Sequence, residues 1–130
     1  MHLVGFGTKL DTAPIRKLAE DLSAEAALRF VDDYLGMLPG RLKRILRAVD
    51  QEDAKVALDA LLSLRVTSSM SGALDTAASC RELESLVRAG HFAQARAEAT
   101  RLSTELHYLQ DAAPDVLQRA RDELSRTSWN

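Results

Sequence analysis

The sequence predicts an all-α protein, an antiparallel four-helix bundle with short extra helices at its N- and C-terminal ends. Hydrophobic residues make up 46% of the 130 residues but aromatic residues only 5%, so the expected core is mostly Leu, Ala and Val. Alanine and leucine are strong helix formers, and the β-branched and aromatic residues that strands favour are scarce. Turn signals are few, and apolar residues recur at helical spacing between them.

The first predicted helix begins after Asp11, an N-cap residue that a first-turn proline, Pro14, follows. It is expected to end near Asp21. Ser23 is the predicted cap of a second helix, whose apolar positions are Ala27, Phe30, Val31, Tyr34 and Leu38. We expect the sequence Leu-Pro-Gly at 38–40 to break that helix. A short amphipathic segment then carries Leu42, Ile45, Leu46 and Val49.

Three longer helices are expected in the second half of the chain. The acids at 50–53 suit the start of a helix with apolar spacing from Ala54 to Ser68, and Gly72 permits a tight turn after it. The next helix runs over 73–87 and ends at Ala89–Gly90, and another runs over about 92–112. A short helix is expected after Pro114. Amphipathic helices joined by short turns form an antiparallel bundle most simply, and all 130 residues are expected to form one domain.

Composition and motifs exclude several classes of function. The net charge of −2 gives no global attraction to nucleic acid or acidic membranes. A single cysteine, Cys80, and no apolar run near the ~20 residues of a membrane span indicate a cytoplasmic protein. The chain lacks a P-loop, Cys-x-x-Cys and His-x-x-x-His, so we expect no enzyme activity, cofactor or metal.

Cys80 falls in a predicted core stripe and is interpreted as a buried structural thiol. The basic run Arg41, Lys43, Arg44 and Arg47 lacks interleaved aromatic residues and is interpreted as a solvated helix face.

Residues 61–73, Leu-Leu-Ser-Leu-Arg-Val-Thr-Ser-Ser-Met-Ser-Gly-Ala, are the most informative stretch. They resemble the signature helix of histidine phosphotransfer (HPt) domains, roughly His-x-Leu-Lys-Gly-Ser-Ser followed after a few residues by Gly-Ala. The alignment needs no gap, and Arg65 replaces the lysine. The flanks agree at Phe30, Tyr34, Cys80, Leu83, Glu84 and Gly90. The resemblance covers about residues 23–110.

Two positions depart from the family pattern. Leu62 stands where the phosphoacceptor histidine belongs, and Val66 stands where a glycine leaves room for the partner's phosphorylated aspartate. In the family, an imidazole nitrogen attacks the aspartyl phosphate of a receiver domain, which a leucine side chain cannot do. Arg65 could still hold an anion with its fork of donors. The resemblance therefore implies a pseudo-HPt signalling module that binds a response-regulator receiver domain without accepting phosphate at the usual site.

Helical geometry gives an independent prediction for residues 62 and 66. Positions 54, 58, 61, 64 or 65 and 68 trace one face, and Lys55, Asp59, Leu62, Val66 and Ser69 trace its neighbour. If the first face is core, Leu62 and Val66 point outward. Three interpretations are open. The N-terminal helix or the tail covers the two side chains, they are a stray apolar pair on the surface, or they form an interaction patch. Exposure forgoes roughly 1.5–3 kcal/mol of burial for each side chain, which association with a partner recovers.

The expected partner-binding residues are Lys55, Asp59, Leu62, Arg65, Val66 and Ser69. Besides receiver binding, two functions stay open. One is a homodimerising helical scaffold that uses the Leu62–Val66 face on itself. The other is phosphotransfer through another histidine, either His91 at a predicted helix junction or His107 on the helix over about 92–112. The three histidines, His2, His91 and His107, lie far apart in sequence.

Overall fold

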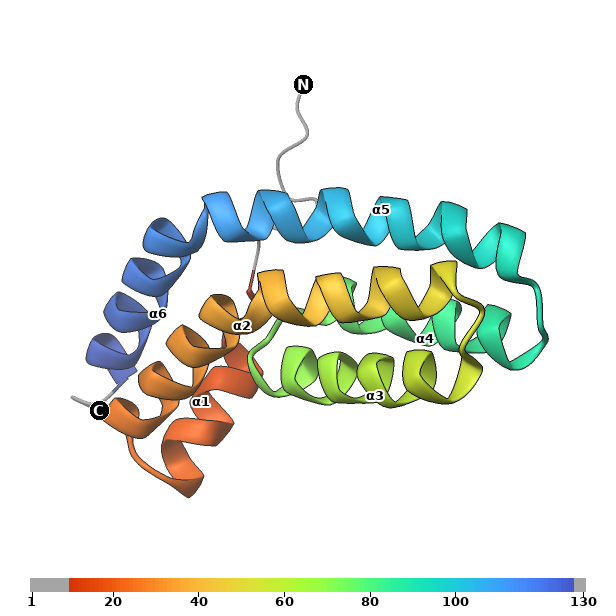
Figure 1. Cartoon of the computed structure of the whole chain (residues 1–130). Coiled ribbons are helices and arrows are strands. Elements are labelled where there is room, and N and C mark those ends of the chain that lie inside the picture. Colours follow the sequence, from red (N-terminus) through yellow and green to blue (C-terminus); the bar gives the residue numbers. More distant parts are fainter. Residues whose placement is uncertain (1–9, 128–130) are drawn as a thin grey trace.

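Within residues 10–127, which the computed structural model describes, the chain forms six α-helices and no strand (Figure 1). The prediction of an all-α fold is therefore confirmed. None of the described helices is long and apolar enough to span a membrane. The helices are α1 (Thr12–Asp21), α2 (Ala24–Asp50), α3 (Ala54–Met70), α4 (Leu74–Arg88), α5 (Phe92–Asp111) and α6 (Ala113–Thr127).

Helices α2, α3, α4 and α5 surround a common core. Helix α2 packs against α3 and α5, and α4 packs against the same two helices. The first part of α2 reaches beyond α3 and α4, where α1 and α6 pack against it (Figure 1). One cluster of buried apolar residues runs through both parts, so the terminal helices extend the core. Its largest fully buried side chains are Leu38, Ile45, Leu61, Leu64, Leu83, Leu102, Leu106 and Leu109.

Local capping fixes where three helices begin. The side chains of Asp11, Ser23 and Asp53 each accept a hydrogen bond from a backbone N–H two or three residues further on. Such bonds satisfy donors that the first turn of a helix leaves without a partner. The predicted caps at Asp11 and Ser23 are confirmed.

Helix α2 runs without a break through Pro39, so the prediction that the chain breaks there is wrong. Proline lacks the N–H that would bond to the carbonyl of Leu35, four residues earlier. That carbonyl instead accepts a hydrogen bond from Gln110 Nε2 of α5, at 3.2 Å. Because a partner on another helix replaces the missing donor, the short segment expected at 42–49 is the C-terminal part of α2.

Gly72 makes the turn between α3 and α4 and also anchors the start of α1. Its φ of +85° is a conformation that side chains disfavour. Its carbonyl accepts a hydrogen bond from the N–H of Asp11, with 2.7 Å between N and O. A Cβ at residue 72 would lie 2.3 Å from the carbonyl oxygen of Asp11. Only glycine fits both the turn and the close approach of this second backbone.

Candidate partner-binding site

Leu62, Val66 and Met70 form an exposed apolar stripe along α3. Their exposed fractions are 47%, 43% and 39%. Residues four apart lie on one helical face, and the opposite side of α3 is buried through Ala57, Ala60, Leu61, Leu64 and Ser68. The prediction that Leu62 and Val66 point outward is confirmed. Among the described helices none buries them, contrary to the alternative that the N-terminal helix covers them.

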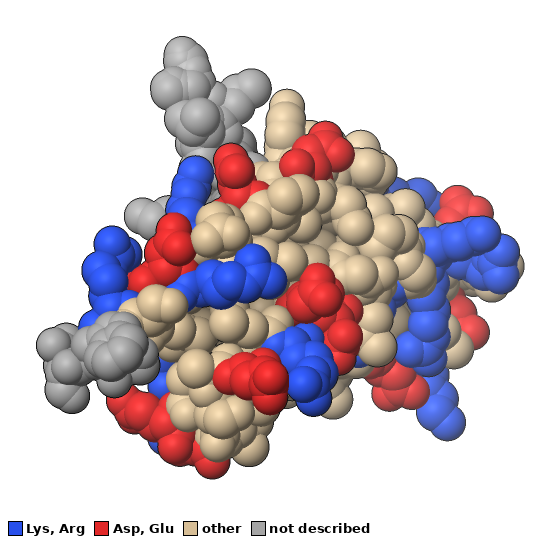
Figure 2. Space-filling model, turned by 90° about the vertical axis from the view of Figure 1, so that its left-hand side faces the viewer, with Lys and Arg blue, Asp and Glu red and all other residues tan. Residues whose placement is uncertain are grey.

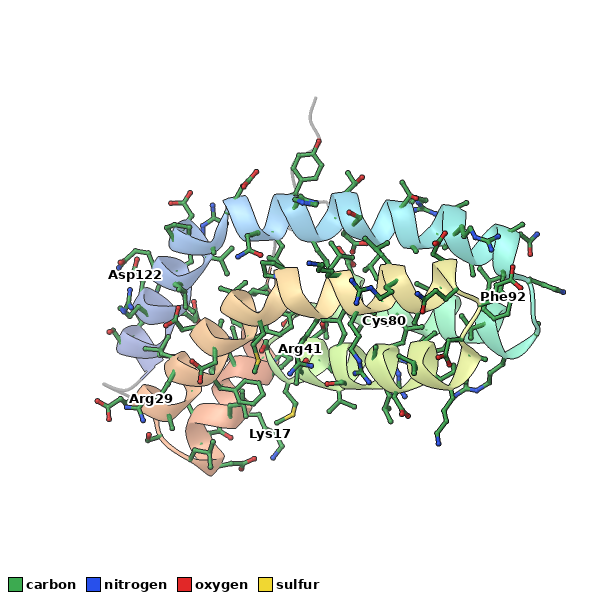
Figure 3. The ribbon with its side chains drawn as sticks, viewed as in Figure 1. Lys17, Arg29, Arg41, Cys80, Phe92 and Asp122 are labelled. Atoms are coloured by element: carbon green, nitrogen blue, oxygen red, sulfur yellow. The ribbon has the colours of Figure 1, made fainter. Side chains whose placement is uncertain are left out.

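The stripe continues onto α2 through a contact that the sequence did not reveal. Arg41 of α2 donates hydrogen bonds to the Ser63 hydroxyl of α3 and to the Met37 sulfur, the latter at 3.4 Å. Figure 3 shows Arg41 at the junction of the two helices. Met37 is half exposed and so adds apolar surface beside α3. The repeat 62, 66, 70 was readable in the sequence, but Met37 depends on how α2 and α3 pack.

The polar residues expected on this face lie near the stripe. Lys55 and Asp59 are exposed on the α3 turns that precede Leu62, and Ser69 is half-buried at the other end. Their spacing places them on the same side of α3 as Leu62 and Val66. Lys55, Asp59, Leu62, Val66 and Ser69 thus lie along one side of α3, and partner binding through them stays a prediction.

Arg65, the sixth residue, makes a different contact. Its Nε donates to both carboxylate oxygens of Glu84 on α4, each at 3.1 Å. The Glu84 side chain is only 5% exposed, so Arg65 neutralises a carboxylate that burial would otherwise leave without a counter-charge. In the structure Arg65 holds this carboxylate of the protein itself through Nε, and binding of a partner's anion stays a prediction.

Hydrogen bonds join two pairs of polar side chains inside the helix bundle. The hydroxyls of Tyr34 and Ser68 lie 2.7 Å apart. Glu105 accepts a hydrogen bond from Ser79 at 2.9 Å, and burial raises the pKa of its carboxyl group.

Burial also raises the pKa of the Cys80 thiol, to about 12. A fully buried thiol with a raised pKa is a poor nucleophile, in agreement with the structural role predicted for Cys80.

The two described histidines are not part of α3. His107 is exposed on α5, and its Nδ1 donates to the carbonyl oxygen of Ser103 at 2.7 Å. His91 is exposed at the turn between α4 and α5. His2 lies outside the described residues. Phosphate chemistry at these positions stays a prediction.

Charged side chains are mixed at the end of the molecule formed by α1 and α6. Figure 2 shows Lys and Arg interspersed with Asp and Glu over this end. Ion pairs account for part of the mixture, including Arg16 of α1 with Glu123 of α6 at 3.6 Å. This surface does not form the single-sign field that recruits nucleic acid.

Known proteins share this architecture. The Hpt domain family matches residues 29–126. Histidine-containing phosphotransfer protein B (HptB) from Pseudomonas aeruginosa PAO1 is 24% identical, with 85% of this chain and 95% of that chain covered and a TM-score of 0.74. The HPT domain from the Hpt sensor hybrid histidine kinase from Shewanella is 23% identical, with 93% and 97% covered and a TM-score of 0.52. No curated protein matches the chain.

The family match confirms the resemblance inferred from the signature helix. The resemblance was expected over about residues 23–110, whereas the match begins at residue 29 and continues to residue 126, within α6. Hpt domains relay phosphate in two-component systems, as carriers of the phosphoryl group. Because the match spans most of the sequence, this chain belongs to the Hpt domain family.

Proposed function

We propose that this chain binds the receiver domain of a response regulator through α3 and accepts no phosphate at position 62. In this proposal the 130 residues act as one cytoplasmic domain, whose docking face lies on the four-helix bundle of α2–α5. The observation that carries the proposal is the exposed Leu62 side chain, which the resemblance to the signature helix aligns with the family's phosphoacceptor. Leucine has no nucleophilic atom, so it cannot take a phosphoryl group from an aspartate.

Receiver domains are the proposed partners because Hpt domains exchange phosphate with them. The apolar stripe supports docking, since covering Leu62 and Val66 recovers roughly 1.5–3 kcal/mol for each side chain. Val66 is a second reason to expect binding without phosphate transfer. In this proposal its side chain fills the space that the family's glycine leaves open for the phosphorylated aspartate. A chain of this kind competes with true phosphotransfer proteins or serves as an adaptor.

Titration calorimetry against purified receiver domains of the host's response regulators tests this proposal. We expect at least one receiver domain to bind and the Leu62→Asp variant to lose that binding. Leu22→Asp is the matched control, because Leu22 is 62% exposed at the turn between α1 and α2. The proposal fails if no receiver domain binds or if both variants weaken binding equally.

A second candidate is self-association through the same stripe, which would make the chain a homodimerising scaffold. The observation in its favour is that exposed apolar side chains of this kind are commonly covered in assemblies. Sedimentation equilibrium would show a dimer that Leu62→Asp converts to a monomer. A chain that stays monomeric at high concentration would exclude this candidate.

A further inference from the structure

The C-terminal part of α2 carries an unusual concentration of positive charge. Residues 36–49 include Arg41, Lys43, Arg44 and Arg47 but no acidic residue, although the whole chain has a net charge of −2. Arg41, Arg44 and Arg47 are spaced by three residues and form a line along the helix, the α2 ridge. Arg44 and Arg47 are exposed, and Arg41 is half-buried.

The α2 ridge makes no ion pair within the described part of the chain, although Asp50, at the end of α2, stands three residues after Arg47. Among the described residues none forms an ion pair with Arg41, Arg44 or Arg47. The residues three and four positions from Arg44 are Gly40, Arg41, Arg47 and Ala48, so its charged helical neighbours are both cations. Like charges at this spacing repel each other. By contrast, Arg29, Arg96 and Arg101 each pair with a glutamate.

One end of the α2 ridge, Arg41, contacts the helix that carries the apolar stripe. Arg41 joins the two features, because its guanidinium donates to Ser63, the neighbour of Leu62. Asp59 is an acidic residue on the stripe's own face, and Lys55 adds a cation one turn further. The combined surface is an apolar centre beside a positive rim whose arginines make no ion pair with the described residues.

Building on the proposed function, we propose that the receiver domain that docks on α3 presents acidic side chains to the α2 ridge, and that this complementarity speeds its association. Opposite charges at the rim of an interface steer two proteins together, whereas the apolar centre holds the complex. The α2 ridge then acts chiefly on the association rate, and Leu62 and Val66 act on the dissociation rate.

The apolar centre favours a protein partner over nucleic acid. Phosphate backbones are bound by cations and hydrogen-bond donors, so they give no reason to expose Leu62, Val66 and Met37. The carboxylate of Asp59 would also face the phosphates. A protein surface with an apolar centre and an acidic rim satisfies both parts of the face.

Stopped-flow association with a receiver domain that binds the native chain tests the inference. The variant Arg44→Glu/Arg47→Glu reverses two charges of the ridge. Arg119→Glu/Arg121→Glu reverses two exposed arginines of α6 and changes the net charge equally. At low salt we expect the ridge variant to associate at least about tenfold more slowly and the control to match the native rate. We also expect added NaCl to slow the native chain, a measurement that needs no variant.

Each outcome bears on the inference separately from the proposed function. If Leu62→Asp abolishes binding while the ridge variant associates at the native rate, the ridge has no steering role and receiver binding stands. Equal slowing of the ridge and control variants would also overturn the inference. If no receiver domain binds the native chain, both fail together. Tighter binding of a short duplex DNA than of any receiver domain, lost in the ridge variant, would assign the ridge to nucleic acid instead.

Discussion

Arg65 Nε of α3 donates to both carboxylate oxygens of Glu84 on α4, at 3.1 Å each. The resemblance to the family's signature helix aligns Arg65 with a lysine, and Arg65 directly follows the buried Leu64. The ion pair ties α3 to α4 at the level of the apolar stripe. The arginine at this position therefore contributes to the structure of the bundle.

Arg65→Ala should destabilise the fold, because it leaves the Glu84 carboxylate buried without a counter-charge. Breaking a buried pair typically costs 3–5 kcal/mol. Since the Arg65 side chain is 26% exposed, we expect the free energy of unfolding in urea to fall by about 2–3 kcal/mol. The double variant Arg65→Ala/Glu84→Gln should regain part of this loss. Equal stability of the single and double variants would show that the carboxylate charge is not what matters.

Gly72→Ala should destabilise more than Gly90→Ala, although both glycines have positive φ, +85° and +75°. A Cβ at residue 90 meets no atom within 4 Å, whereas one at residue 72 meets the backbone of Asp11. The positive φ alone costs an alanine about 1–2 kcal/mol at either position. At residue 72 the added Cβ must also displace the start of α1. Thermal unfolding of the two variants compares them. A similar loss of stability in both would mean that the contact with Asp11 contributes nothing.

Gln110→Ala should lower the free energy of unfolding by about 1 kcal/mol, because the Leu35 carbonyl loses its hydrogen-bond donor. In a Pro39→Ala background residue 39 regains an N–H for the same carbonyl, so Gln110→Ala should cost clearly less there. The two differences in the free energy of unfolding form a double-mutant cycle. A cycle without coupling would contradict the explanation given for the unbroken α2.

Glu105→Gln should stabilise the protein increasingly as the pH rises from acid to neutral. Burial raises the pKa of Glu105 above its ordinary value of 4.5, so folding favours the protonated form. The stability that this carboxyl group contributes is complete in acid and is lost as the pH rises through the raised pKa. Glutamine stays neutral and can still accept the hydrogen bond from Ser79. Urea unfolding of both proteins across this range would contradict the prediction if the difference were independent of pH.

The parts of the fold that could be predicted from the sequence are those that local interactions determine. Ser23 and Asp11 cap helices through residues two or three positions away, and the buried faces follow from spacing within one helix. The unbroken α2 could not be predicted, because Leu35 and Gln110 lie 75 residues apart. The Arg65–Glu84 pair and the Arg41–Ser63 contact likewise depend on tertiary packing. Exposure of Leu62 followed from helical periodicity only once the opposite face was taken as core.

The most direct measurement follows label transfer from a phosphorylated receiver domain to the native chain and to the Leu62→His/Val66→Gly variant. In the proposed alignment, this variant supplies the family's histidine at position 62 and its glycine at position 66. We predict that the native chain binds without taking up label and that the variant takes it up in an acid-labile form. Transfer to the native chain, abolished by His107→Ala or His91→Ala, would contradict the account by placing the chemistry on another histidine. Failure of both proteins to bind any receiver domain would contradict it outright.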